Sequence, residues 1–133
     1  MKRGTITIDG KGNVHIPSTP VWMSACEIAD LFGAFSGKVS VQIKTIFKEG
    51  LLMETEAMRT IQSGQGFIDL YGIEMITMLS FRIATPQAKT LRRWIIRRLT
   101  EKKKTSPPLF VYYKKDGTTE FENRLVVVFN NFS

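Results

Sequence analysis

Residues 24–48 read SACEIADLFGAFSGKVSVQIKTIFK, and this stretch predicts two helices joined by a tight turn. Ser24 and Glu27 have the spacing of a capping box, in which the hydroxyl accepts from a first-turn N–H and the carboxylate reaches back to the cap. Gly33 is suited to end this helix, because glycine adopts a positive φ without strain. The first helix is therefore expected to run from Ser24 to about Phe32.

A second helix is expected from Ser36 to about Lys48. Serine is a residue type that caps helix N-termini, and the pair Glu49-Gly50 is suited to close the helix. In between, apolar residues recur with the 3.6-residue period of a helix at Val39, Ile43 and Ile46 or Phe47. Because the polar residues fall largely outside this stripe, the helix is expected to pack on one side only.

The two helices have the spacing of a helix-turn-helix, a motif that presents its second helix to DNA. Ala29 lets the helices approach closely, Gly33 accepts the turn conformation, and Val39 packs into the angle between them. The pattern is loose, since a purely structural pair of helices satisfies it equally well. It also departs from the usual motif at Gln42, where an apolar residue is usual and the hydrophobic position shifts to Ile43.

The polar side of the second helix supplies candidate DNA contacts. Lys38 and Gln42 are of types that reach base edges or phosphates in the major groove, and Lys44 and Lys48 are candidate phosphate contacts. The full set expected to line the groove is Lys38, Ser40, Gln42, Lys44, Thr45 and Lys48.

A β-hairpin is expected after the second helix. The runs Leu52–Thr60 and Gly66–Tyr71 suit two strands around the loop Ser63-Gly64-Gln65-Gly66, whose glycines permit left-handed turns. A helix-turn-helix followed by two strands around such a loop has the order of a winged helix. Arg59, beside the loop, is then expected to meet a phosphate or the minor groove.

Two further helices follow the hairpin. Residues from Ile73 to about Ile83 are apolar nearly all round, which predicts a helix buried in the core. Thr85-Pro86 matches an N-cap followed by proline in the first turn. It predicts a helix to about Lys102 whose apolar face holds Ala88, Leu91, Trp94, Ile95 and Leu99.

The net charge of +7 is concentrated in the last of these helices. Residues 89–104 hold eight basic residues against Glu101 alone, so the rest of the chain is close to neutral. A confined basic block is a footprint for a polyanion such as DNA. Lys89, Arg93 and Arg97 are expected to contact phosphates that flank the site. The alternatives are a solvated face that aids solubility and a surface for an acidic protein partner.

Short β-hairpins are expected at both ends of this core. The runs Thr5–Ile8 and Asn13–Ile16 flank an Asp-Gly turn, and the runs Leu109–Lys115 and Thr119–Phe129 flank a second one. The predicted fold is α+β, with a winged helix-turn-helix-like core and additional β-hairpins at the N- and C-termini. Residues 1–105 are expected to form the DNA-binding domain, and residues 106–133 a C-terminal hairpin packed on it.

The residue inventory argues against an enzyme. Cys26 is the only cysteine and His15 the only histidine, so neither a disulfide nor a His/Cys metal cluster is expected. Cys26 is expected to be a buried structural thiol, because no neighbour lowers its pKa, and His15 to face solvent. Glu54 and Glu56 are expected on one face of a strand as solvated carboxylates. We therefore expect no catalytic residue, metal, cofactor or small-molecule substrate.

The chain is expected to be cytoplasmic. Its N-terminus lacks the apolar run of a signal peptide, and no stretch approaches the length of a membrane span.

Two longer motifs resemble a known family. The first is Glu27-Ile28-Ala29-Asp30-Leu31-Phe32-Gly33, followed by Val39, Ile43 and Ile46-Phe47. The second, which is the more specific, is Leu70-Tyr71-Gly72-Ile73-Glu74-Met75-Ile76 with Phe81-Arg82-Ile83 and then Ala88, Arg92 and Trp94.

On these motifs, which span about residues 27–99, the chain resembles the RhuM-like virulence proteins, related in style to phage antirepressor-type DNA-binding modules. The resemblance implies a DNA-associated regulator, often encoded in mobile or prophage-like contexts, without established catalytic chemistry. The hairpin before Pro17 and the strands after Pro108 lie outside the resemblance.

The sequence thus predicts a basic helix-turn-helix protein that binds double-stranded DNA selectively and regulates transcription. A homodimer is expected, because one short helix is usually too weak for selective recognition. Two alternatives stay open. One is a protein–protein interaction module whose basic helix binds an acidic partner, and the other is an RNA-binding protein.

Overall fold

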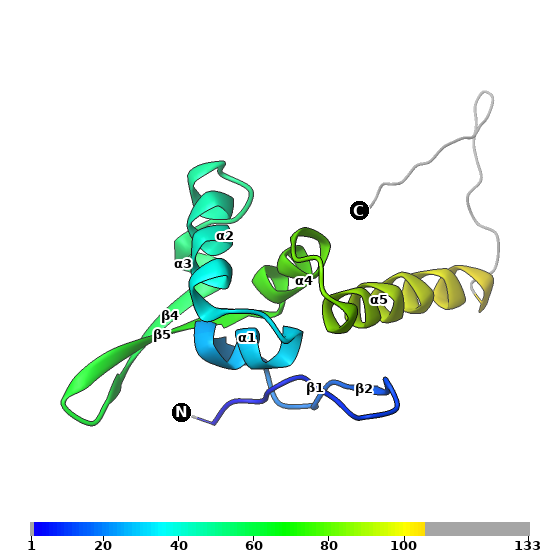
Figure 1. Cartoon of the computed structure of the whole chain (residues 1–133), viewed down its shortest axis with the longest axis horizontal. Coiled ribbons are helices and arrows are strands. Elements are labelled where there is room, and N and C mark those ends of the chain that lie inside the picture. The colour runs from blue at the N-terminus through cyan, green and yellow to red at the C-terminus, as the bar shows by residue number, and fades with distance from the viewer. Residues whose placement is uncertain (1, 106–133) are drawn as a thin grey trace. The chain divides into compact units, whose positions relative to one another are not determined.

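The computed structural model describes residues 2–105, so the strands predicted between Leu109 and Phe129 lie outside the described residues. The described residues belong to two units, which meet in the sequence between Ile96 and Arg97. Within the described range the fold is α+β, with five helices and two small antiparallel sheets (Figure 1). The elements are β1 (Thr7–Ile8), β2 (Val14–His15), β3 (Trp22–Ser24), α1 (Ala25–Phe32), α2 (Ser36–Lys48), α3 (Glu54–Ala57), β4 (Met58–Ser63), β5 (Gly66–Gly72), α4 (Ile73–Arg82) and α5 (Pro86–Thr105).

The predicted start and end of α1 are both confirmed. The Ser24 hydroxyl accepts from the backbone N–H of Glu27 at 3.1 Å, and the Glu27 carboxylate accepts from the backbone N–H of Ser24 at 2.9 Å. Gly33 ends the helix in the left-handed region, with φ of 60°. The turn to α2 is therefore short and fixed by backbone conformation.

The predicted extent of α2 is confirmed, but its predicted cap is wrong. The N-cap is Phe35, whose carbonyl accepts from the N–H groups of Lys38 and Val39, so Ser36 is already the first helical residue. The helix has no side-chain cap at this end. Its apolar stripe packs into the core as expected, with Val39, Ile43 and Ile46 all buried.

The larger sheet has the strand order β3-β5-β4, with both pairs antiparallel. The hairpin β4–β5 was expected, and its turn is the pair Gly64-Gln65, where Gly64 has φ of 62°. Strand β3 was not expected. It pairs Trp22 with Gly72 and Ser24 with Leu70, which puts the strand before α1 against the far strand of the hairpin.

The segment before β4 corrects a prediction. A strand was expected from Leu52, but Glu54–Ala57 form a single helical turn, α3, in which the Met53 carbonyl accepts from the N–H groups of Glu56 and Ala57. Glu54 and Glu56 therefore do not share one face of a strand. Both are exposed.

Helix α4 is less buried than its composition predicts. One face, with Met75, Ile76 and Leu79, is fully buried, whereas Ile73 and Phe81 are exposed on the other. The expectation of burial nearly all round is therefore wrong. Apolar residues at the surface are common in folded proteins, because there is not enough polar surface to cover a small fold.

Helix α5 begins as predicted. The hydroxyl of Thr85 accepts from the N–H of Ala88 at 3.1 Å and also donates to the carbonyl of Phe32 at 2.6 Å. Ala88 and Leu91 are buried in the core. In the second unit the structure describes residues 97–105, which are helical.

The first unit has one core cluster, to which the N-terminal strands, α1, α2, β5, α4 and the start of α5 all contribute. The predicted N-terminal hairpin is confirmed as β1–β2, in which Thr7 pairs with His15. Cys26, expected to be buried, is exposed on α1. It follows the cap by two positions, and the buried residues of α1 are Ile28, Ala29 and Phe32, which lie on another face of the helix.

Candidate nucleic-acid interface

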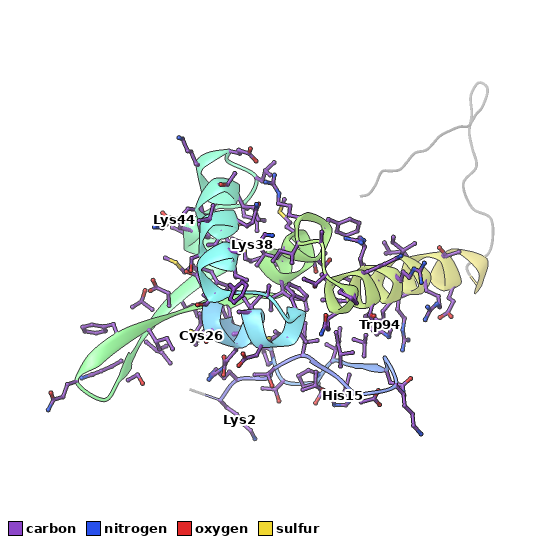
Figure 2. The ribbon with its side chains drawn as sticks, in the orientation of Figure 1. Lys2, His15, Cys26, Lys38, Lys44 and Trp94 are labelled. Carbon is purple, nitrogen blue, oxygen red and sulfur yellow. The ribbon has the colours of Figure 1, made fainter. Side chains whose placement is uncertain are left out.

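Helix α2 turns three lysines toward solvent. Lys38, Lys44 and Lys48 are exposed, and all three lie outside the buried stripe. The cause is the helical period of about 100° per residue, which puts these positions about 100–180° around the helix from Val39 and Ile43. Figure 2 labels Lys38 and Lys44 on this helix.

Gln42 lies on a flank of α2 and contacts α4. Its side-chain carbonyl accepts from Arg82 over a long distance of 3.5 Å, and the same guanidinium pairs with Glu49 at 2.7 Å. Gln42 is half-buried. The amide therefore faces the neighbouring helix and not the outward side, which does not favour the base contact expected for it.

Ser40 and Thr45 are also half-buried. The Thr45 hydroxyl donates to the backbone carbonyl of Val41 at 2.9 Å, one turn earlier in the same helix. Such a bond keeps the hydroxyl proton within the helix. The six residues expected to line a groove thus divide into three exposed lysines and three half-buried polar residues.

Val41 is a surface residue that sequence reasoning missed. Its side chain is 60% exposed, and its position on the helix lies between those of the three lysines. The sequence does contain a signal for it, which is the position of Val41 around the helix. Val41 falls outside the apolar stripe formed by Val39, Ile43 and Ile46. An apolar residue on the exposed side of a surface helix is a candidate for contact with a binding partner.

Arg59 does not lie beside the hairpin loop, where it was expected. It pairs across the sheet with Leu70, and its guanidinium stacks over the ring of Trp22 at 4.4 Å from the ring centroid. This cation–π contact holds the charge near the base of the hairpin. The far end instead presents Phe67, whose side chain is 77% exposed.

On α5, the neighbours Arg92 and Arg93 face different surroundings. Arg92 donates to the backbone carbonyl of Ser80 at 2.7 Å and lies 5.9 Å from the ring centroid of Phe81. Lys89 and Arg93 are exposed on the same helix. Arg97 is exposed as well, in the second unit.

Helix α4 links the two basic helices. It packs against α2 and accepts the hydrogen bond from Arg92 of α5. Figure 1 shows α4 between α2 and the start of α5. The exposed cations of α2 and those at the start of α5 therefore belong to two helices that are held by a common neighbour.

The lysines of α2 take no part in the ion pairs Arg3–Glu27 and Arg82–Glu49. A hydrogen bond from Arg3, which outweighs desolvation, lowers the pKa of Glu27, and the same pair raises the pKa of Arg3. This pair ties the N-terminal segment to α1, because the Arg3 guanidinium also donates to the Trp22 carbonyl at 2.9 Å.

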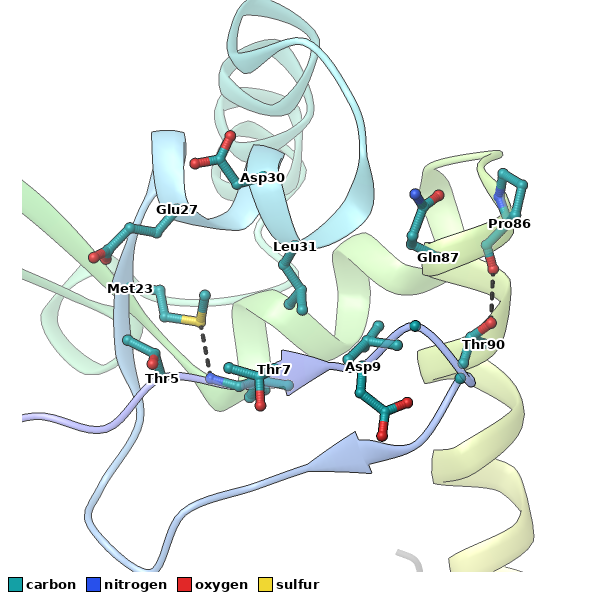
Figure 3. Close-up of a pocket in the computed structure, with 14 residues that line it drawn as sticks. Thr5, Thr7, Asp9, Met23, Glu27, Asp30, Leu31, Pro86, Gln87 and Thr90 are labelled. Atoms are coloured by element: carbon teal, nitrogen blue, oxygen red, sulfur yellow. Dashed lines mark hydrogen bonds between the residues drawn. The ribbon is translucent and has the colours of Figure 1, made fainter.

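An open cavity of about 680 Å³ lies between the β1–β2 hairpin, α1 and the start of α5 (Figure 3). Its lining includes the carboxylates of Asp9 and Glu27, and both are already bonded within the protein. Asp9 accepts from the backbone N–H groups of Lys11 and Asn13, and Glu27 binds Arg3.

Residue types that serve catalysis or metal binding are scattered within residues 2–105. His15 is exposed on β2, as expected. The described part of the chain contains no group of three or more His, Cys, Asp or Glu residues able to hold a metal ion. None of its helices combines the length and the apolar character needed to cross a membrane.

Comparison of the chain with protein-family models, with curated proteins and with solved structures gives no match.

Proposed function

We propose that the protein binds double-stranded DNA, with α2 in the major groove. The observation that carries the proposal is the outward face of α2, where Lys38, Lys44 and Lys48 are exposed and unpaired within the described residues. An exposed helix of this kind, packed on one side and cationic on the other, fits the width of the groove and the charge of its phosphates.

The arrangement of elements around α2 supports the proposal. The pair α1–α2 is inserted between β3 and β4, and the sheet order is β3-β5-β4. A strand before the helix pair that joins a hairpin after it is the layout of a winged helix. In that layout α2 is the recognition helix and the β4–β5 hairpin is the wing.

Lys89 and Arg93 are proposed to add phosphate contacts. Arg97, in the second unit, is proposed as a phosphate contact by itself. Arg59 is proposed to contribute less, because its guanidinium is already stacked on Trp22. We also propose that the protein is a DNA-associated regulator, as its resemblance to the RhuM-like proteins implies. We further propose recognition by a homodimer, whose two copies of α2 contact half-sites about one helical turn of DNA apart.

The direct test is titration of a labelled random duplex, followed by fluorescence anisotropy, over a range from about 50 to about 200 mM salt. The double variant Lys38→Ala/Lys44→Ala is expected to bind more weakly than the wild type. Its slope of log affinity against log salt is expected to become shallower by about 1.8, or about 0.9 for each phosphate that the variant leaves without a lysine partner.

The matched control is Lys2→Ala/Lys11→Ala. Both residues are exposed, and the variant removes the same two charges from the N-terminal segment instead of α2. It is expected to keep most of the wild-type slope. Equal effects in both variants would assign binding to net charge alone and contradict the role of α2. No binding of the wild type even at about 50 mM salt would contradict DNA binding and favour an acidic protein partner.

A further inference from the structure

The centre of the outward face of α2 is apolar. Val41 follows Lys38 by three residues and precedes Lys44 by three, so one side chain lies about one turn before it and the other about one turn after it on the same side of the helix. Lys48 lies two turns beyond Val41. Such a face can contact phosphates through its lysines and an apolar group through the valine at its middle.

The polar residues of α2 are poorly placed to read bases from this face. Ser40 and Gln42 lie on opposite flanks, about 100° before and after Val41, and both are half-buried. The carbonyl oxygen of Gln42 already accepts from Arg82, whereas an amide needs both its oxygen and its nitrogen to read adenine. The outermost side chain between the lysines is therefore aliphatic.

The major groove offers one apolar feature on a base edge, the 5-methyl group of thymine. We propose that Val41 contacts this methyl group and makes the protein selective for thymine at one position of the DNA site. This inference rests on the DNA binding proposed above. The lysines hold α2 against the phosphates on either side. Val41 then covers the methyl group and removes it from water.

The contact requires no rearrangement of the protein. Val41 is already 60% exposed, and its backbone is fixed within α2, where its carbonyl accepts from Thr45. As a β-branched residue in a helix, it has one strongly preferred rotamer. Little conformational freedom is therefore lost when the side chain meets the base.

The test uses duplexes that the wild-type protein enriches from a random-sequence pool. Each enriched duplex is synthesised again with deoxyuridine in place of thymidine, which removes the 5-methyl groups and leaves the base pairing unchanged. The wild type is expected to bind the thymine form about fourfold more tightly for each methyl covered, the ratio that corresponds to one buried methylene. Val41→Ala removes both branched methyl groups and leaves only the Cβ, so its preference for the thymine form is expected to fall well below that of the wild type.

Thr45→Ser is the matched control, because it removes the other methyl group near this face and keeps the hydroxyl that bonds the Val41 carbonyl. It is expected to keep the wild-type preference for thymine. Since Val41 is exposed, thermal unfolding of Val41→Ala is expected to match that of the wild type within about 0.5 kcal/mol, the usual range for surface substitutions.

The outcomes separate the two proposals. If the wild type binds both forms equally, or Val41→Ala keeps the preference, the reading of thymine by Val41 is wrong and DNA binding stands. If no duplex is enriched and none is bound at low salt, DNA binding itself is wrong.

Discussion

At the scale of single residues, Gly33 sets the angle between α1 and α2. Its φ of 60° lies in the left-handed region, and its backbone N–H bonds the carbonyls of Ala29 and Asp30. A Cβ at this position would also lie 2.7 Å from the side-chain nitrogen of Gln87, which is at the flexible end of an exposed side chain. Most of the requirement for glycine therefore comes from backbone conformation.

We expect Gly33→Ala to lower the free energy of unfolding by about 1–2 kcal/mol, the cost of a left-handed conformation for a residue with a Cβ. Gly37→Ala is the control, since Gly37 is helical and a Cβ there meets no atom within 4 Å. It is expected to leave stability unchanged or slightly raised. Chemical denaturation measures both, and equal effects would contradict the role given to the turn.

Glu27 makes stability depend on pH. The hydrogen bond from Arg3 lowers the pKa of this carboxyl in the folded state. Stability from the pair is therefore complete above the ordinary glutamate pKa, about 4.3, and is lost as the pH falls through the lower, folded-state value.

The variant Glu27→Gln is expected to lose this contribution at neutral pH. It keeps an acceptor for the backbone N–H of Ser24 but has no charge to pair with Arg3. Its unfolding midpoint is expected to approach that of the wild type as the pH falls through the pKa of Glu27. Thermal unfolding from neutral pH down to about pH 2 provides the measurement, and a constant difference across this range would show that the ion pair does not matter.

At the scale of elements, α5 uses adjacent arginines for different purposes. Arg92 joins α5 to α4 through the Ser80 carbonyl, whereas Arg93 is exposed. We expect Arg92→Ala to lower the free energy of unfolding by about 2 kcal/mol, as for a hydrogen bond to a charged group.

Arg93→Ala is expected to leave stability within about 0.5 kcal/mol of the wild type and to reduce the salt slope of DNA binding by about 0.9. Denaturation and anisotropy on both variants check the division of roles. If Arg92→Ala lost DNA binding and kept its stability, Arg92 would be a DNA contact and its structural role would be contradicted.

Elements with local signals were predictable, and elements fixed by distant contacts were not. The start of α1 follows from Ser24 and Glu27, which are three residues apart. Strand β3 depends instead on pairing with β5, as in the Ser24–Leu70 pair, and has no turn that joins the two strands. The helical turn α3 has no readable signal in the sequence, because so short a helix does not complete the period by which helices are recognised.

At the scale of the whole molecule, the exposed cations of the first unit that we propose to meet phosphates are Lys38, Lys44, Lys48, Lys89 and Arg93. If each neutralises one phosphate, the slope of log affinity against log salt is expected to be about −4.5. Anisotropy titrations at several salt concentrations measure it. A slope near zero would exclude a phosphate-based interface.

The candidate site was predictable in outline and not in detail. The lysines of α2 can be found because their phase relative to the core stripe is a property of the sequence. The pairing of Gln42 with Arg82, 40 residues away, and the stacking of Arg59 on Trp22 depend on the packing of separate elements. These contacts decide which polar side chains remain available to contact DNA. No local pattern in the sequence reveals them.

The hydroxyl of Thr85 donates to the end of α1 and accepts from the first turn of α5. A residue at this position must both give and receive a proton within a few ångströms of the backbone. Aspartate, a good cap elsewhere, offers no proton when ionised, and valine offers neither group. Random replacement of this codon under selection for folding should therefore return serine well ahead of either of them.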